Sequence, residues 1–189
     1  MEIILKNLRL AFLNCYEPGS YEGKLSYGAQ LIIDPADAAQ VKKLDAAIEH
    51  CAIEKWGAKA GAFLKEMKAK DRVCFRHGPK MAASGEPYDG FADKFYLSCS
   101  APENKAPLCI KRDKSVSTPR DGDLYAGCYA DVKLALWAQD NQYGKRINAQ
   151  PLVFQHRAHG DAFAGGPPPS VDGMDDLSDT GEELADLMG

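Results

Sequence analysis

The stretch Tyr129–Trp137, YADVKLALW, carries the clearest secondary-structure pattern in the chain. Val132, Leu134 and Leu136 lie on one face of an extended chain, and the residues between them lie on the opposite face. This period of two is typical of a β-strand with one buried face. We therefore expect a strand over residues 124–137.

Further strands are expected on both sides of this run. Over residues 3–13, alternation puts Leu8, Leu10 and Phe12 on one apolar face. A loop is expected at Glu17–Ser20, where proline and glycine follow each other. The remaining expected strands cover residues 24–33, 95–99, 108–110 and 147–155, the last of them after a turn at residues 142–144.

A helical segment interrupts the strands. Apolar residues recur at helical spacing over residues 35–56, where Asp34 and Pro35 provide an N-cap and a first-turn proline, and Gly57 provides an end. A shorter helix is expected over residues 60–69. Helices and strands do not alternate along the chain, so a mainly β fold is favoured over a parallel α/β sheet. We expect a small closed or partly closed barrel with a helical insert.

The length of 189 residues fits one domain followed by a tail. Hydrophobic residues make up 45% of the chain, which excludes a mainly disordered protein. No apolar run reaches the roughly 18 residues of a membrane span, and Met1–Lys6 lacks the pattern of a signal peptide. The six cysteines form no CxxC pair, so we expect reduced, buried thiols in a cytoplasmic protein without membrane contact.

The formal net charge of −4 conceals two parts of opposite sign. Residues 1–164, the predicted domain, hold all 23 basic residues and 20 of the 27 acidic ones, which gives +3. Residues 165–189 hold the other seven acids and neither a basic nor an aromatic residue. Because Gly165–Ser170 is a Gly/Pro linker, we expect residues 165–189 to form a disordered acidic tail.

The end of this tail has features of a partner-binding segment. Thr180 and Glu183 have the spacing of a capping box, and apolar residues follow at helical spacing. A short helix could form on a partner's basic surface, and a purely solubilising tail is the alternative. The residues predicted to bind protein partners are Asp175, Asp176, Asp179, Glu182, Glu183, Leu184, Asp186, Leu187 and Met188.

Motifs of an enzyme or a cofactor site are missing from the sequence. It has no GxxxxGK[ST] phosphate loop, no GxSxG elbow and no deaminase pattern of HxE with PCxxC. His156 and His159 form the one cluster that resembles a metal site, but the sequence shows no third ligand. We therefore expect solvated histidines, and we predict no catalytic residue, no metal and no cofactor.

Basic residues interleaved with aromatic ones occur in several segments. This combination suits single-stranded nucleic acid, because cations neutralise phosphates while aromatic rings stack on unpaired bases. Phe95 is expected in the core, whereas Tyr96 and Trp137 are favoured as stacking platforms. The residues predicted to bind nucleic acid are Phe75, Arg76, Lys80, Tyr88, Phe91, Lys94, Tyr96, Lys111, Arg112, Lys114, Tyr129, Lys133, Trp137, Tyr143, Lys145 and Arg146.

A set of strand and turn patterns runs through residues 23–35 (GKLSYGAQLIIDP), 123–132 (DLYAGCYADV), 143–149 (YGKRINA), 153–155 and 160–161. Together with the acidic tail, this set resembles the phage single-stranded-DNA-binding proteins of the OB-fold type. The resemblance implies an OB barrel, binding of single strands without sequence specificity, and a tail that recruits replication partners. The chain departs from related binders at its end, Asp186–Gly189, which lacks the aromatic residue that often closes such tails.

We predict a non-enzymatic single-stranded-DNA-binding protein that acts in phage DNA replication, recombination or repair, in the cytoplasm of a bacterial host. The tail is predicted to compete with DNA for a basic groove and, once displaced, to recruit replication or recombination proteins. One alternative is a protein-interaction module or regulator whose acidic tail mimics nucleic acid. Another is a metal-dependent nuclease that uses aspartates or histidines. A homo-oligomer is compatible with the sequence.

Overall fold

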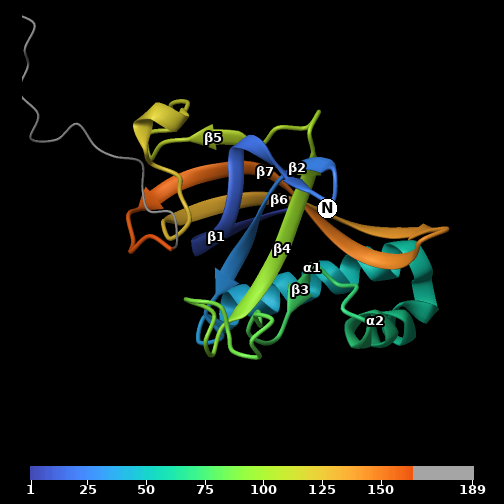
Figure 1. Ribbon diagram of the computed structural model, residues 1–189. Helices are drawn as coiled ribbons and strands as arrows, with labels where there is room; N and C mark the ends of the chain where they lie inside the picture. The colour runs from blue at the N-terminus through green and yellow to red at the C-terminus, as the bar shows by residue number, and fades with distance from the viewer. Residues whose placement is uncertain (164–189) are drawn as a thin grey trace, which may run out of the picture.

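The computed structural model describes residues 1–163, so the predicted acidic tail lies outside the described residues. A seven-stranded sheet curls into a barrel, and two helices lie together beneath it (Figure 1). This mainly β barrel with one helical insert confirms the fold expected from the sequence. Its elements are β1 (Glu2–Tyr21), β2 (Lys24–Ile33), α1 (Ala38–Trp56), η1 (Gly57–Lys59), α2 (Ala60–Ala69), β3 (Phe75–Arg76), β4 (Phe95–Pro102), β5 (Leu108–Ile110), η2 (Pro119–Asp121), β6 (Tyr129–Asn141) and β7 (Gly144–Ala158).

The sheet closes through a short segment between α2 and β4. The strands are hydrogen-bonded in the order β3-β4-β2-β1-β6-β7-β5, and all pairs are antiparallel except β5 with β7. Val73 forms a parallel bridge with Ile147 of β7, and the Cys74 amide donates to the Ile147 carbonyl over 2.9 Å. The next two residues form β3 and pair with β4. Residues 73–76 therefore join β7 to β4 and complete the ring.

The barrel interior holds the apolar faces that the alternation predicted. Leu10, Leu31 and Leu97 are fully buried in β1, β2 and β4, as are Leu134 and Phe154 in β6 and β7. Buried residues of α1 belong to the same cluster, which places this helix over the core. All six cysteines are free and buried, as expected. No helix within residues 1–163 is long and apolar enough to cross a membrane.

The structure corrects two element boundaries in the first quarter of the chain. The loop expected at Glu17–Ser20 does not form, because β1 pairs with β2 as far as Tyr21. α1 begins after Asp37 and not after Asp34–Pro35, because the Asp37 carboxylate accepts a hydrogen bond from the Gln40 amide over 3.1 Å and caps the helix.

The strand expected over residues 124–137 also starts later than predicted. β6 begins at residue 129, because the amide of Cys128 donates to the Tyr125 carbonyl over 3.2 Å and closes a turn just before it. From there the predicted alternation is confirmed. Val132 and its inward neighbours are buried, whereas Trp137 is 40% exposed on the outer face.

Phe12 points away from the core, contrary to the expected alternation. The register of β1 against β2 shifts between Ala11 and Asn14, and Phe12 has a φ of 48°. A β-bulge of this kind turns a side chain toward the other face of the sheet. Phe12 is therefore 49% exposed on the outer face, while Leu8 and Leu10 stay in the core as predicted.

Candidate nucleic-acid interface

Five side chains form a row across the outer face of five adjacent strands. In the register, Tyr129 of β6 pairs with Arg9 of β1, Arg9 with Ile32 of β2, Ile32 with Tyr96 of β4, and Tyr96 with Arg76 of β3. Cross-strand partners point to the same face, and neighbouring strands are about 4.8 Å apart. These five residues, which we call the transverse row, therefore span about 19 Å. They mix aromatic, cationic and apolar groups.

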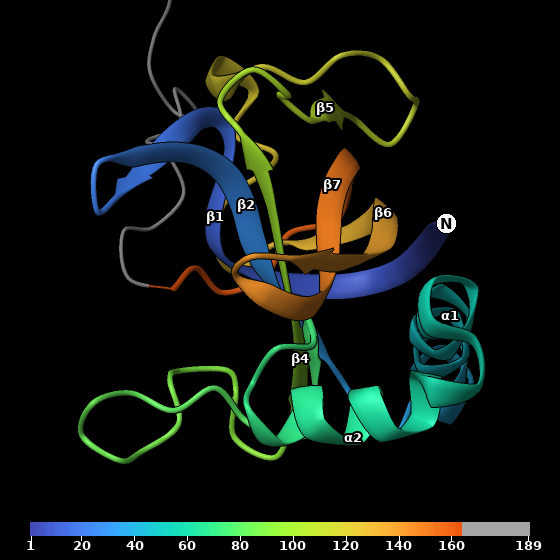
Figure 2. The same cartoon turned by 90° about the vertical axis from the view of Figure 1, so that its right-hand side faces the viewer.

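A cluster of four rings lies over the β4 end of this row and forms what we call the aromatic patch: Phe12, Tyr88, Phe91 and Tyr96. The Phe12 ring centroid is 5.0 Å from that of Tyr88, and Phe91 is 5.8 Å from Tyr96, both pairs edge to face. Tyr88 and Phe91 belong to the loop of residues 77–94, which projects from the barrel beside α2 (Figure 2). Phe91 is fully buried, whereas Phe12 and Tyr88 are 49% and 38% exposed. The buried ring therefore anchors the loop, and the exposed rings face solvent.

Lys80 adds a positive charge to the aromatic patch. Its Nζ lies 5.4 Å from the ring centroid of Tyr96 and 6.0 Å from that of Phe12. No carboxylate within residues 1–163 lies at ion-pair distance from Lys80. Burial lowers the pKa of Lys80, and the nearby Arg76 guanidinium acts in the same direction. An anion bound here would thus relieve the repulsion between two cations.

A pocket of about 570 Å³ continues from the aromatic patch toward the end of α2. Its lining includes Arg76, Lys80 and Tyr96, together with Lys68 and Asp71. The Arg76 guanidinium donates to two backbone carbonyls, and its Nε lies 3.3 Å from the Asp71 carboxylate. Three cations against one carboxylate give this pocket a positive lining, which suits a phosphate chain.

Arg9 supplies a fixed positive charge nearer the β6 end of the transverse row. It donates to the carbonyls of Asp161 over 2.7 Å and of Gly127 over 3.3 Å, and its guanidinium lies 4.2 Å from the ring centroid of Phe163. Within the described part of the chain, no carboxylate forms an ion pair with Arg9. With its register partner Tyr129, Arg9 lines an open pocket of about 460 Å³.

The outer face beyond the row carries short side chains. Ala11, Gln30 and Ser98 are register partners on β1, β2 and β4, and the Ser98 hydroxyl donates to the Gln30 side-chain carbonyl over 2.6 Å. A Cβ on Gly28 would meet the Cys99 carbonyl oxygen at 2.5 Å, so a larger residue does not fit there. On the strip between the aromatic patch and the β1–β2 turn, Ala11 is buried in the small cluster with Phe91, whereas Gln30 and Ser98 are half-buried.

The structure brings five of the sequence-predicted residues together. Arg76, Lys80, Tyr88 and Tyr96 lie in the aromatic patch or next to it, and Tyr129 lies at the far end of the transverse row. Strand pairing brings Arg76, Tyr96 and Tyr129 onto one face, and the 77–94 loop adds Lys80 and Tyr88. The contact role of each residue stays a prediction.

Two other predicted residues cannot stack on a base. Phe75 is 2% exposed and belongs to the barrel core, because its neighbour Arg76 takes the outward position in β3. Phe91 is fully buried beneath the other rings of the patch. Their predicted contact role is wrong, and Phe91 has a supporting role instead. Phe95 was expected in the core. It packs against the barrel core but remains partly exposed.

The side chains of three predicted residues lie outside the aromatic patch, and their role in binding stays a prediction. Lys94 pairs with Asp34 over 2.8 Å at the base of the 77–94 loop. Lys133 pairs over 2.6 Å with a carboxylate at the start of β1. Trp137 is eight residues along β6 from Tyr129, which is about 27 Å at the rise of a strand, and lies beside the C-terminal half of α1.

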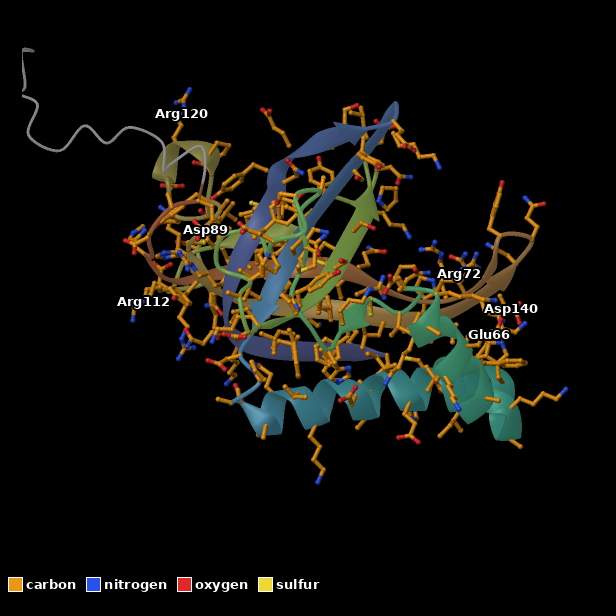
Figure 3. The ribbon with its side chains drawn as sticks, turned by 60° about the horizontal axis from the view of Figure 1, so that its bottom comes forward. Glu66, Arg72, Asp89, Arg112, Arg120 and Asp140 are labelled. Atoms are coloured by element: carbon orange, nitrogen blue, oxygen red, sulfur yellow. The ribbon has the colours of Figure 1, made fainter. Side chains whose placement is uncertain are left out.

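Another predicted group lies at the β6–β7 turn beside α2. Tyr143 is 72% exposed, and its carbonyl accepts a hydrogen bond of 3.0 Å from Arg72, which marks this end of the molecule in Figure 3. The Nζ of Lys145 lies 4.6 Å from the ring centroid of Phe63 in α2. Arg146 is exposed in the same hairpin. Their role in binding stays a prediction.

The last predicted group, Lys111, Arg112 and Lys114, follows β5. Arg112 is labelled in Figure 3 on the side of the molecule opposite Arg72. The Lys111 Nζ lies 2.6 Å from Asp121, and this bond, with those from Thr118, lowers the pKa of Asp121 to about 2. The ion pair of Lys111 therefore links the end of β5 to η2. Arg112 and Lys114 are exposed, and the role of all three residues in binding stays a prediction.

Sequence reasoning missed three residues of this surface. Phe12 is turned outward by a bulge that no residue pattern announced. Arg9 lies on the polar side of the first expected strand, opposite the apolar face, and this position was a usable signal. Phe163 is the last aromatic residue before the Gly/Pro linker, which also set it apart.

The expectation of two solvated histidines is wrong for His156, which is 6% exposed. The structure also brings Asp123 close to His156 and His159. Sequence alone could not show this third group, because Asp123 is distant from both histidines along the chain.

Comparison with known proteins identifies the family. The model of a family described as "Enterobacter phage Enc34, ssDNA-binding protein" matches residues 1–185. Putative protein p50 of Acyrthosiphon pisum secondary endosymbiont phage 1 is 37% identical over 188 residues, which cover 97% of each chain.

Solved structures show the same fold. The single-stranded DNA-binding protein from bacteriophage Enc34, in complex with ssDNA, is similar with a TM-score of 0.68 at 21% identity, over 86% of this chain and 89% of that one. The single-stranded DNA-binding protein gp2.5 of bacteriophage T7 gives a TM-score of 0.54 at 13% identity, over 94% of this chain and 97% of that one. The chain therefore belongs to the Enc34 family of phage single-stranded-DNA-binding proteins.

Proposed function

We propose that this protein binds single-stranded DNA without sequence preference, along the outer face of β1, β2 and β4. The observation that carries the proposal is the aromatic patch, in which the exposed rings of Phe12 and Tyr88 lie beside Lys80, a cation without a counter-ion in residues 1–163. OB folds bind oligonucleotides across their second and third strands, and β2 and β4 hold these places in the barrel. Membership of the Enc34 family supports the same function.

The geometry divides the proposed contacts between rings and cations. Phe12, Tyr88 and Tyr96 would stack on unpaired bases, each with a contribution of about 1–3 kcal/mol. Lys80 and Arg9 would neutralise phosphates along the transverse row and release their counterions, which makes binding sensitive to salt.

Stacking on rings explains why the protein would select single strands over duplex DNA and why it would accept any sequence. A ring can reach the face of a base in a single strand, whereas duplex bases are stacked on each other. Every base has such a face, so stacking tolerates all sequences. The patch offers ring faces and positive charge, which serve binding, and the proposed activity is binding alone.

The proposed place of this activity is phage DNA replication, recombination or repair, all of which expose single strands. We assign residues 170–189 two roles, competition with DNA for the cations of the interface and recruitment of partner proteins. Both roles rest on the charge of −7 in residues 165–189 against +3 in residues 1–164.

Titration of labelled oligonucleotides, followed by fluorescence anisotropy, tests the proposal. We expect the full chain to bind a single strand more tightly than the duplex of the same sequence. Phe12→Ala should weaken single-strand binding roughly 5- to 150-fold, because one stacking ring is lost. The matched control Trp137→Ala removes another exposed aromatic side chain, far from the patch, and should change the affinity little.

Three results would contradict this assignment. Equal or tighter binding of the duplex would refute single-strand specificity. A larger loss with Trp137→Ala than with Phe12→Ala would move the interface to the outer face of β6. If no DNA binds even after removal of residues 170–189, the regulator alternative is favoured instead.

A further inference from the structure

Three potential metal ligands converge beside the end of β7. His156 lies in β7, where it pairs with Ala130 of β6, and His159 follows just after the strand ends. Asp123 belongs to the segment between η2 and β6. One ligand atom from each of these three residues lies within 4.8 Å of the others. The fold thus provides the third ligand that the sequence does not reveal.

His156 is the member of this cluster that lacks a partner. Its side chain is 6% exposed, and its Nε2 has no hydrogen-bond partner within residues 1–163. Buried polar atoms without partners are rare, because burial removes their bonds to water. A neutral imidazole binds metals through such a nitrogen, so an ion at this position would satisfy it.

The other two ligands are already oriented by hydrogen bonds. The Ser117 hydroxyl donates to Asp123 Oδ2 over 3.3 Å, and the Tyr16 hydroxyl lies 2.7 Å from Ser117 Oγ. The Nδ1 of His159 lies 3.3 Å from the Tyr125 hydroxyl, and the two rings stack with an interplanar angle of 14°. Metal-binding histidines and carboxylates are typically held by contacts of this kind, which leave the other ring nitrogen for the ion.

We propose that Asp123, His156 and His159 form a binding site for a first-row transition-metal dication, with Zn²⁺ as the best fit. Two imidazoles and one carboxylate suit Zn²⁺, whereas Mg²⁺ and Ca²⁺ prefer oxygen ligands. Bonds of about 2.0–2.2 Å place ligand atoms roughly 3.4 Å apart around a tetrahedral ion, so the cluster has to contract. His159 is exposed and Asp123 is half-buried, so small rotations of their side chains within these contacts can bring the ligand atoms closer. Water completes the coordination.

An ion here would fix the chain where it leaves β7. The segment after His159 leads to Phe163, whose amide donates to the Ala126 carbonyl over 3.0 Å and whose ring lies against Arg9. Holding His159 to Asp123 would therefore stabilise the connection between the barrel and the Arg9 end of the transverse row. This structural role is independent of the proposed DNA binding.

Metal titration of the tag-free, full-length protein tests the site. Protein freed of metal by a chelator is titrated with Co²⁺, whose visible absorption reports the number of ligands, and with Zn²⁺ in competition with a chromogenic chelator. We expect one ion per chain and a higher Tm with Zn²⁺. His159→Gln and Asp123→Asn should each weaken Zn²⁺ binding about tenfold or more. The control His50→Gln removes an exposed histidine next to Glu54 on α1 and should leave binding unchanged.

Loss of the Co²⁺ absorption and of the Zn²⁺-dependent rise in Tm in both site variants, with both retained in His50→Gln, would support the site. Equal Zn²⁺ affinity in all four proteins would overturn it, as would a failure of the unaltered protein to bind one ion per chain. Circular dichroism checks that each variant is folded. Because the two site variants lie in different segments, either one that folds decides the question.

Discussion

Replacing Phe91 by alanine tests how the aromatic patch is built. Phe91 is fully buried, and its ring centroid lies 6.3 Å from Phe12, 6.5 Å from Tyr88 and 5.8 Å from Tyr96. It belongs to a small cluster on the outer face that is separate from the barrel core. We expect its loss to release the 77–94 loop and to leave the barrel intact.

The size of the effect follows from what else holds the loop. Removing a buried phenylalanine side chain costs about 3–5 kcal/mol. At its base the 77–94 loop is held by the ion pairs of Lys94 with Asp34 and of His77 with Asp45, which are partly exposed and therefore weak, and by the His77 ring, which packs on Phe75 and Phe95. Phe91 is the one buried residue of the loop, so its ring provides the main attachment beyond this base. Its removal should raise the open fraction of the loop about a hundredfold or more.

Hydrogen exchange measured by mass spectrometry follows this opening. The amides of Tyr88 and Lys94 donate to backbone carbonyls within the loop over 3.0 Å, and they should exchange about a hundredfold faster in the variant. Peptides from β2 and β4 should keep their protection. Single-strand affinity should also fall, because Tyr88 and Lys80 lose their positions although the Phe91 ring itself is out of reach of DNA.

Phe12→Ala is the matched control, since it removes an exposed ring of the same patch. It should speed exchange in the 77–94 loop far less than Phe91→Ala does, because half of the Phe12 ring is exposed, and it should still weaken DNA binding. Unchanged loop exchange in Phe91→Ala would show that other contacts attach the loop. Loss of protection throughout β2 and β4 would show that the small cluster is part of the core. Either result would show that Phe91 is not the separate anchor of the loop.

Three further measurements address other features. Lys80→Gln should reduce the slope of log affinity against log salt by about 0.7, because one phosphate contact is lost, and an unchanged slope would remove Lys80 from the interface. Because its pKa is depressed to about 2 from 3.8, Asp121 should contribute stability that is present above about pH 4 and lost as the pH falls toward 2. Lys111→Met should raise this pKa in a carboxyl NMR titration, and an Asp121 that titrates near 3.8 in the unaltered protein would contradict the argument. Deletion of residues 170–189 should tighten single-strand binding at low salt, less so as salt increases, and an unchanged affinity at low salt would argue against competition by the tail.

Elements with strong local signals were predicted well. β2 and α2 match the expected residues 24–33 and 60–69, because their patterns are unbroken and end at turns. The start of α1 was misplaced, because Asp34 and Asp37 are both suitable N-caps. In the fold, Asp34 instead accepts a hydrogen bond from the Ala36 amide over 2.9 Å, in the bend that precedes the helix. The direction in which the chain leaves β2 decides which of these two aspartates caps α1, and the sequence does not show that direction.

The sequence predicts that the candidate site combines aromatic and basic residues. It predicts less well which individual residues are exposed there. Phe75 and Phe91 are buried, while Tyr88 and Tyr96, from the same stretch, are partly exposed. No periodicity separates them, since their burial depends on β1 and β2, which are distant in sequence. Phe12 is the reverse case, because alternation places it inside and the bulge turns it outward. A φ of 48° is unusual for phenylalanine, so no local signal predicts it.

The end of the described chain connects the interface to the acidic tail. Phe163 lies against Arg9 on one side, and on the other a Cβ at Gly90 would meet its ring at 2.6 Å. The chain therefore leaves the barrel between the transverse row and the 77–94 loop. A chain of about 20 residues with the flexibility predicted for the tail spans roughly 25 Å, more than the length of the row. Tethered there at millimolar effective concentration, the tail carboxylates would reach the same cations that the proposal assigns to DNA phosphates. An incoming strand would then have to displace them, which is why the salt dependence of the tail deletion separates competition from mere solubilisation.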